Sequence, residues 1–333
     1  MTPDPQNTSP DPRNADPQSP PGLPANTRAP QASAREWLEF LLLRLLVGSI
    51  GILPRPLARA AGASIGAAAW LLLPRLRRVG LRNLELALPL RPPAGRDRIL
   101  RRLYTLLGWH LAEFCRLPRI TRANAEHLFR YDGLDHYLAA RAKGRGVLVL
   151  TGHLGAWELS SFFHSLMGYP MGMVIRRLDN PLVDAFVNRI RCLHGNRVLH
   201  KDDFARGLLQ SMHRGETVGI LMDTNMTPPQ GVFVPFFGVP ACTASGLARI
   251  AAHSQAAVLP GFLLWEPAEN MYILHFGPEL TLQHTADPAA DALANTALFT
   301  STLESWIRRY PEQWLWVHRR WKTRPPGEPS LYP

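Results

Sequence analysis

The chain has 333 residues, 46% of them hydrophobic, and 37 basic against 26 acidic side chains give it a formal net charge of +11. The length and hydrophobic content are enough for one large core or two modest ones, so a single catalytic domain with appendages is the simplest expectation. The basic residues are nearly all arginine, which favours an anionic partner: nucleic acid, anionic lipid headgroups or an acidic carrier protein. Three cysteines without paired spacing argue against a disulfide framework and a structural zinc site.

The N-terminal segment has the composition of a disordered tail. Residues 1–33 are rich in Pro, Asn, Gln and Ser and have almost no large apolar side chains. Such a segment cannot bury enough surface to offset the entropy of ordering it. It also lacks the basic start and short apolar run of a signal peptide.

Two apolar stretches follow the tail, and we predict that residues 34–73 are a membrane anchor. WLEFLLLRLLVGSIGIL (37–53) and AAGASIGAAAWLLL (60–73) precede the arginine-rich PRLRRVGLR. Apolar helices followed by arginines are typical of an anchor whose next domain stays in the cytoplasm. Both stretches are shorter than a span of about 20 residues, so an interfacial position stays open. A pair of buried core helices is the alternative.

Residues 74–327 show helices and strands in alternation, which predicts an α/β domain. We expect a mixed, largely parallel sheet flanked by helices, with the active site at the carboxyl ends of strands. Helical spacing is seen in RILRRLYTLLGWHLAEFCRL, PLVDAFVNRIRCLHG and DDFARGLLQSMHRG. The strand candidates are 146–153, 171–177, 217–223, 256–265 and 271–277.

The most informative segment is VLVLTGHLGAWELSSFF, in which His153 ends a strand and Glu158 begins a helix. On one regular helix, side chains five residues apart do not meet. With His153 in the turn and Glu158 in the first helical turn they can approach each other, and Gly152 and Gly155 allow that turn. His153 would accept the proton of an attacking hydroxyl, and Glu158 would hold the other ring nitrogen and stabilise the imidazolium that forms.

The spacing alone is weak evidence. A histidine with an acidic residue five positions later is expected about once by chance in this composition, and His127 with Asp132 is a second instance. Only the strand and the glycine turn before it distinguish His153, so a structural histidine stays open on this evidence.

TGHLGAWE resembles the H-x4-D/E block of glycerolipid acyltransferases. More narrowly, residues 37–327 are similar to the late acyltransferases of bacterial lipid A biosynthesis, the lauroyl and myristoyl transferases. The further blocks of that family occur in order: MVIRRLDNPLVD, KDDFARGLLQSMHRGETVGILMD, GVFVPFFGVPACTASGLARIA and PEQWLWVHRRWKTRPPG.

The resemblance implies an acyl carrier protein thioester as donor and a lipid A-type glycolipid hydroxyl as acceptor, without a metal or organic cofactor. It makes 74–327 the acyltransferase domain, on the cytoplasmic face of the inner membrane and in contact with membrane lipids. His153 and Glu158 match the catalytic pair, and Arg176 and Asp223 match substrate-binding positions. Arg177, Thr224 and Asn225 depart from the family pattern, which leaves the acceptor open.

For three further segments the sequence is compatible with two interpretations each. Arg176 with Arg177 could bind an anionic headgroup, or form a surface pair with Asp179 or Asp184. GVFVPFFGVP could line an acyl groove or belong to the core. The aromatic and basic residues between 314 and 322 could form a membrane or phosphate-binding face, or a packed terminal helix with a charged edge.

Other functions stay possible at this point. The acceptor could be a lysophospholipid or another glycolipid, or water in an acyl-thioester hydrolase. A non-catalytic binder is a further alternative, although the arginines accompany apolar stretches and form no continuous stripe, which weighs against nucleic acid as the partner.

Overall fold

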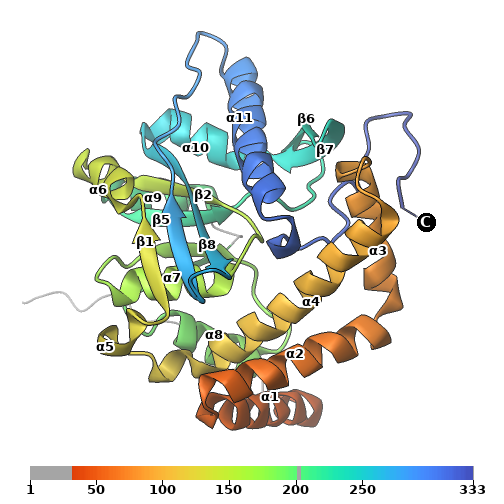
Figure 1. Cartoon of the computed structure of the whole chain (residues 1–333). Helices are drawn as coiled ribbons and strands as arrows, with labels where there is room; N and C mark the ends of the chain where they lie inside the picture. Colours follow the sequence, from red (N-terminus) through yellow and green to blue (C-terminus); the bar gives the residue numbers. More distant parts are fainter. Residues whose placement is uncertain (1–31, 201–203, 333) are drawn as a thin grey trace, which may run out of the picture.

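The computed structural model describes residues 32–200 and 204–332 (Figure 1). The predicted disordered tail therefore lies outside the described residues except at its end. There, Ser33 caps the first helix, since its hydroxyl accepts a hydrogen bond from the Glu36 backbone N–H at 3.2 Å and the Glu36 carboxylate bonds back to Ser33.

Four helices precede the sheet: α1 (Ala34–Ile52), α2 (Arg55–Leu72), α3 (Pro74–Ala87) and α4 (Pro93–Arg116). Both α1 and α2 pack against α4, which crosses the molecule between them and the sheet (Figure 1). The small residues of α2 explain this packing. A Cβ atom on Gly62 would lie 2.1 Å from the Gly108 carbonyl oxygen, so the two helix backbones are in direct contact. Small residues at such a crossing allow this close approach.

The structure does not support the predicted membrane anchor over residues 34–73. None of the described helices is, taken singly, long and apolar enough to cross a membrane. Only α2 and α3 taken together reach that length and composition, and they meet at an angle of 89°. The second apolar stretch, with its glycines, is a partner of α4, and the alternative of packed helices holds for that part of the segment.

A seven-stranded sheet in the order β1-β9-β8-β2-β5-β3-β4 forms the centre of the molecule. All neighbouring strands are parallel except β8 and β9, so the predicted mixed, largely parallel sheet flanked by helices is confirmed. The strands are β1 (Phe129–Asp132), β2 (Val147–Thr151), β3 (Gly172–Ile175), β4 (Arg197–His200), β5 (Thr217–Leu221), β8 (Ala257–Glu266) and β9 (Met271–Phe276).

Helices cover both faces of this sheet. The remaining ones are α5 (Arg122–Ala125), α6 (Leu134–Ala142), α7 (Trp157–Leu166), α8 (Pro181–Arg191), α9 (Phe204–His213), α10 (Gly246–Ser254) and α11 (Pro288–Arg309), with short 3-10 turns at Leu117–Arg119 and Pro311–Gln313. Alternate residues of β2 face opposite layers. Val147 and Val149 pack with α4, α6 and α7, whereas Leu148 and Leu150 pack with α9, α10 and α11.

A separate hairpin, β6 (Gly231–Phe236) and β7 (Val239–Ala244), contains the apolar ribbon seen in the sequence. Phe236 is fully buried and packs against Trp314 and Trp321. Of the two interpretations of GVFVPFFGVP, core packing is therefore the one that the structure supports for Phe236.

Candidate active site

The turn between β2 and α7 presents His153 at the carboxyl end of a central strand, as predicted. Gly155 has φ +68°, and a Cβ atom there would lie 2.1 Å from the Leu263 carbonyl oxygen. A Cβ on Gly152 would lie 3.1 Å from a carboxylate oxygen of Asp223. Gly155 is thus required by its left-handed backbone and close approach, whereas a side chain at Gly152 would have to displace the Asp223 carboxylate slightly.

Asp223 is the residue that holds His153. It follows β5, the strand adjacent to β2, so the two residues meet at one edge of the sheet. The His153 backbone N–H donates to Asp223 Oδ2 at 2.7 Å, and His153 Nδ1 lies 2.8 Å from Asp223 Oδ1. An ionised carboxylate only accepts, so Nδ1 carries the proton and Nε2 has the free lone pair.

The charges of this pair shift both pKa values. Burial lowers the pKa of His153, but the charge and hydrogen bond of Asp223, with a smaller contribution from Glu158, raise it by more, so the pKa lies above 6.5. Burial raises the pKa of Asp223, whereas the charge and hydrogen bond of His153 depress it far below its usual range. Asp223, which is fully buried, is therefore an anion at neutral pH.

Glu158 lies where the sequence predicts it, in the first turn of α7, but it does not hold the imidazole ring. Its carboxylate receives two hydrogen bonds from Arg191 of α8, at 2.6 and 2.9 Å. Glu158 is 37% exposed and Arg191 only 12% exposed, so the pair lies at the edge of the site. The His153 ring N–H donates to Asp223, which follows the neighbouring strand, and not to Glu158 as expected.

The structure places Arg176 apart from these contacts. Arg176 follows β3 and is 80% exposed, with one guanidinium hydrogen bond to Asp179 at 2.9 Å. Asp184, the other partner considered from the sequence, instead accepts from the Leu178 backbone N–H and lies in the first turn of α8.

The segment after α11 completes the site, and sequence reasoning does not identify its role. The Trp314 indole N–H donates to Asp223 Oδ2 at 2.8 Å, and the Leu315 backbone N–H donates to the His153 carbonyl at 2.9 Å. His318 lies with its ring centroid 6.4 Å from that of His153, and its Nε2 is 3.0 Å from the Asp223 carbonyl oxygen. Burial lowers the pKa of His318, so its ring is neutral at pH 7.

The tryptophans of this segment are core residues. Trp314, Trp316 and Trp321 are all fully buried, and Arg320 is 1% exposed and donates to the Cys242 carbonyl. The segment is packed, as one of the two interpretations expects, but it runs as turns after the 3-10 helix and not as a terminal helix.

The arrangement can perform base catalysis. His153 is 20% exposed on its side chain, and Nε2 makes no hydrogen bond within the described part of the chain. A hydroxyl brought to Nε2 would lose its proton to a ring that Asp223 keeps in the required tautomer. Among residues 32–200 and 204–332, no group of three His, Cys, Asp or Glu side chains is placed to hold a metal ion.

Comparison with known proteins agrees with the resemblance seen in the sequence. The chain is 31% identical over 299 residues to a lipid A biosynthesis palmitoleoyltransferase of Escherichia coli (strain K12), which covers 90% of this chain and 95% of the relative. It is 30% identical over 304 residues to a lipid A biosynthesis lauroyltransferase of the same strain, with the same coverage. A lipid A biosynthesis myristoyltransferase of that strain is 24% identical over 90% of this chain and 91% of its own length.

The family model for bacterial lipid A biosynthesis acyltransferases matches residues 28–323, which include the four helices before the sheet and the entire site around His153. The chain therefore belongs to the bacterial lipid A biosynthesis acyltransferases.

Proposed function

We propose that this protein transfers a fatty acyl chain from an acyl carrier protein thioester to a hydroxyl of a lipid A-type glycolipid precursor, with His153 as general base. The observation that carries the proposal is the Asp223–His153 pair, which leaves Nε2 as a base of raised pKa at the edge of a sheet. The relatives are named as lipid A acyltransferases, which supports the acceptor class.

In the proposed reaction, His153 carries the only proton that has to be transferred, from the acceptor hydroxyl to the leaving thiolate. Nε2 of His153 takes the proton from the acceptor hydroxyl as its oxygen bonds to the thioester carbonyl carbon. The tetrahedral intermediate then collapses, the carbon–sulfur bond breaks, and the proton on Nε2 passes to the leaving thiolate. Asp223 stabilises the imidazolium that exists between these steps. The products are the ester and the free carrier thiol.

Of the two roles expected for Glu158 from the sequence, our proposal keeps the stabilisation of the imidazolium and gives the hydrogen bond to the ring to Asp223. The charge of Glu158 raises the pKa of His153 without a hydrogen bond to the ring. We assign Glu158, oriented by Arg191, to electrostatic stabilisation of the imidazolium. Arg176 stays a candidate for binding the acceptor, because its high exposure leaves its guanidinium accessible to an anionic headgroup.

Membrane association forms part of the proposal, with the catalytic domain on the cytoplasmic face of the inner membrane. Helix α1 exposes a row of large apolar side chains at helical spacing, and Leu41, Leu42 and Leu45 are each more than half exposed. Such a helix suits the interface of a bilayer, with its apolar side among the acyl chains. Of the two positions that the sequence leaves open for this segment, we propose the interfacial one.

The test is an acyl-transfer assay with labelled acyl carrier protein, comparing the wild type with His153→Ala. His127→Ala is the matched control, because His127 also has an acidic residue five positions later but lies exposed outside the site. Reactions receive the lipid A precursor, a lysophospholipid, or no acceptor. We expect label in the lipid A precursor with the wild type and the control, and a loss of roughly 10²- to 10⁴-fold with His153→Ala.

The other products would contradict parts of the proposal. Label in lysophospholipid alone would replace the acceptor and keep the chemistry. Free fatty acid as the sole product would indicate a thioester hydrolase, and full activity of His153→Ala would remove His153 as the base.

A further inference from the structure

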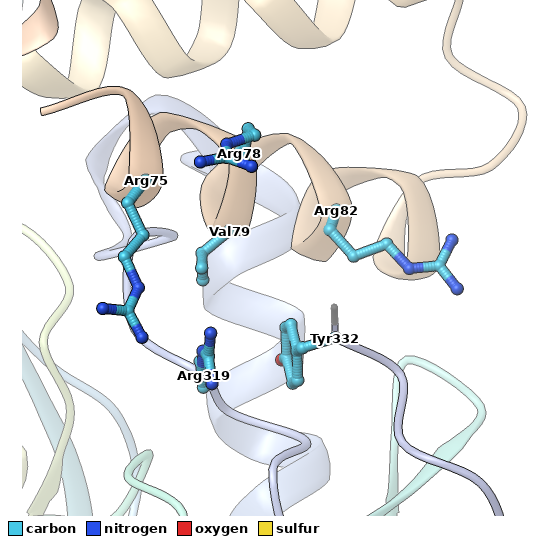
Figure 2. A pocket seen from close by; sticks show the side chains of 6 residues that line it. All are labelled: Arg75, Arg78, Val79, Arg82, Arg319 and Tyr332. Atoms are coloured by element: carbon cyan, nitrogen blue, oxygen red, sulfur yellow. The ribbon is translucent and has the colours of Figure 1, made fainter.

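A cavity lined mainly by arginines lies apart from the residues around His153, between α3 and the C-terminal segment. It has a volume of about 180 Å³ and is lined by Arg75, Arg78, Val79, Arg82, Arg319 and Tyr332. Figure 2 shows Arg75 extending from α3 toward Arg319 of the opposite segment, whereas Arg78 lies over the helix and Arg82 points away from Arg319. Four arginines thus line one cavity, and no acidic side chain among the described residues lines it.

Within the described part of the chain, the positive charge of the three α3 arginines in this lining is only partly compensated. Arg82 donates to Glu85 at 2.7 Å and to the Leu331 carbonyl at 3.0 Å. Arg75 and Arg78 make no hydrogen bond or ion pair with any residue that the structure describes, and both are exposed. Neighbouring guanidinium groups repel each other unless an anion lies between them, and their planar forks match the oxygens of a phosphate.

The floor of the cavity is fixed by buried hydrogen bonds. The Tyr332 hydroxyl donates to Asn83 Oδ1 at 2.6 Å and accepts from the Trp321 backbone N–H at 3.0 Å. The Asn83 amide in turn donates to the carbonyls of Trp316 and His318, at 2.6 and 2.7 Å. These bonds hold α3 against the segment that bears Arg319, so both sides of the cavity are in place before any ligand binds.

Exposed leucines adjoin the arginines. Leu71 and Leu72, at the end of α2, are 71% and 75% exposed, and Leu73 and Leu76 are also exposed at the start of α3. Apolar side chains beside arginines suit a bilayer surface, where leucines enter the acyl region and guanidinium groups meet the phosphates. This neighbourhood favours a phosphate carried by a lipid over a soluble anion.

We propose that this cavity binds the phosphate of an anionic phospholipid headgroup, with Arg75 and Arg78 as its principal ligands and Arg82 and Arg319 at its inner side. Binding there, with Leu71 and Leu72 in the acyl region, fixes the corner between α2 and α3 on the membrane. The site goes beyond the proposed acyl transfer and does not depend on it.

Co-sedimentation of the full chain with vesicles tests the proposal. Vesicles of phosphatidylcholine with phosphatidylglycerol are compared with vesicles in which oleate supplies the same negative charge without a phosphate. The variant is Arg75→Gln/Arg78→Gln. The control, Arg122→Gln/Arg145→Gln, removes the same charge at two exposed arginines that do not line the cavity.

We expect the Arg75/Arg78 variant to bind phosphatidylglycerol vesicles roughly thirtyfold more weakly than the control does. Only the wild type and the control should prefer phosphatidylglycerol over oleate. Acyl transfer to a detergent-dispersed acceptor should be unchanged in the variant, which separates this site from the proposed function; thermal unfolding verifies that each variant is folded.

Equal vesicle binding by the variant and the control would overturn the proposal. It would be overturned too if the variant kept its vesicle binding but lost affinity for inorganic phosphate in calorimetry, since the cavity would then serve a soluble anion. A raised KM for the glycolipid with unchanged vesicle binding would likewise assign the cavity to the acceptor instead.

Discussion

Asp223 contacts His153 twice, accepting one hydrogen bond from its backbone N–H at 2.7 Å and one from its ring at 2.8 Å. The carboxylate thus fixes both the position of the turn and the tautomer of the ring. Trp314 donates a third hydrogen bond to the same carboxylate. The two residues are 70 positions apart in the chain and meet because β2 and β5 are neighbours in the sheet.

Replacing Asp223 with Asn should therefore reduce kcat strongly while leaving the protein folded. An amide can donate to Nδ1, which would move the proton to Nε2 and block the lone pair that accepts the hydroxyl proton. A loss of about 10⁴-fold in kcat is the size expected for such a tautomer change. Steady-state kinetics give the value, and circular dichroism shows whether the fold is kept. Activity near the wild-type level would contradict the role of Asp223.

The pH dependence of kcat/KM should show an acid limb set by His153. The base must be neutral, so activity is low below the pKa of His153 and rises as the pH passes through it. Because that pKa is raised, the limb should lie above pH 6.5. Glu158→Gln removes one of the charges that raise the pKa, so the limb should move to lower pH. The shift should be smaller than the roughly one to three units of a directly contacting charge. A limb that stays in place would separate Glu158 from the electrostatics of His153.

The opposite shift is expected from Arg191. In the wild type its guanidinium compensates the Glu158 carboxylate through two hydrogen bonds. In Arg191→Gln the carboxylate loses that compensation, so it should raise the pKa of His153 further and move the acid limb to higher pH. In the double variant with Glu158→Gln, the effect of Arg191→Gln should vanish if it acts through Glu158. An effect of equal size in both backgrounds would show that Arg191 acts on the site directly.

The sequence predicts much of this fold because its signals are local. All five strand candidates are strands in the structure, since short β-branched runs between helices are typical of a parallel sheet. The short β1 and β4 have no such run and were not predicted. For residues 60–73, apolar composition alone does not distinguish a membrane segment from a helix packed through Gly62 onto another helix.

Local signals in the sequence also identify single residues of the site, but not the contacts between them. His153 is marked by the strand and the glycines around it, and Asp223 by the end of an apolar strand. Their direct contact depends on the order of strands in the sheet, which spacing along the chain does not reveal. The resemblance pairs His153 with Glu158, whereas the hydrogen bond is made with Asp223. Trp314 and His318 enter through a segment without regular structure, so no periodicity indicates their contact with Asp223.

The contact between α2 and α4 gives a last prediction, on stability. A Cβ atom at Gly62 would lie 2.1 Å from the Gly108 carbonyl oxygen, which belongs to a helix backbone and cannot rotate away. Gly62→Ala should therefore force the helices apart and lower the free energy of unfolding by about 1–3 kcal/mol. Gly48→Ala is the matched control, because Gly48 lies on the exposed side of α1 with nothing within 4 Å of the added atom.

In that control the better helix propensity of alanine should raise the free energy of unfolding by about 0.5–1 kcal/mol. Denaturant unfolding of Gly62→Ala, Gly48→Ala and the wild type, all solubilised in one detergent, measures the differences in the free energy of unfolding. Equal stability of the two variants would mean that the helices of the detergent-bound protein do not touch at Gly62. The small residues of 60–73 would then need another explanation, and the interpretation of that stretch as a membrane segment would regain its support.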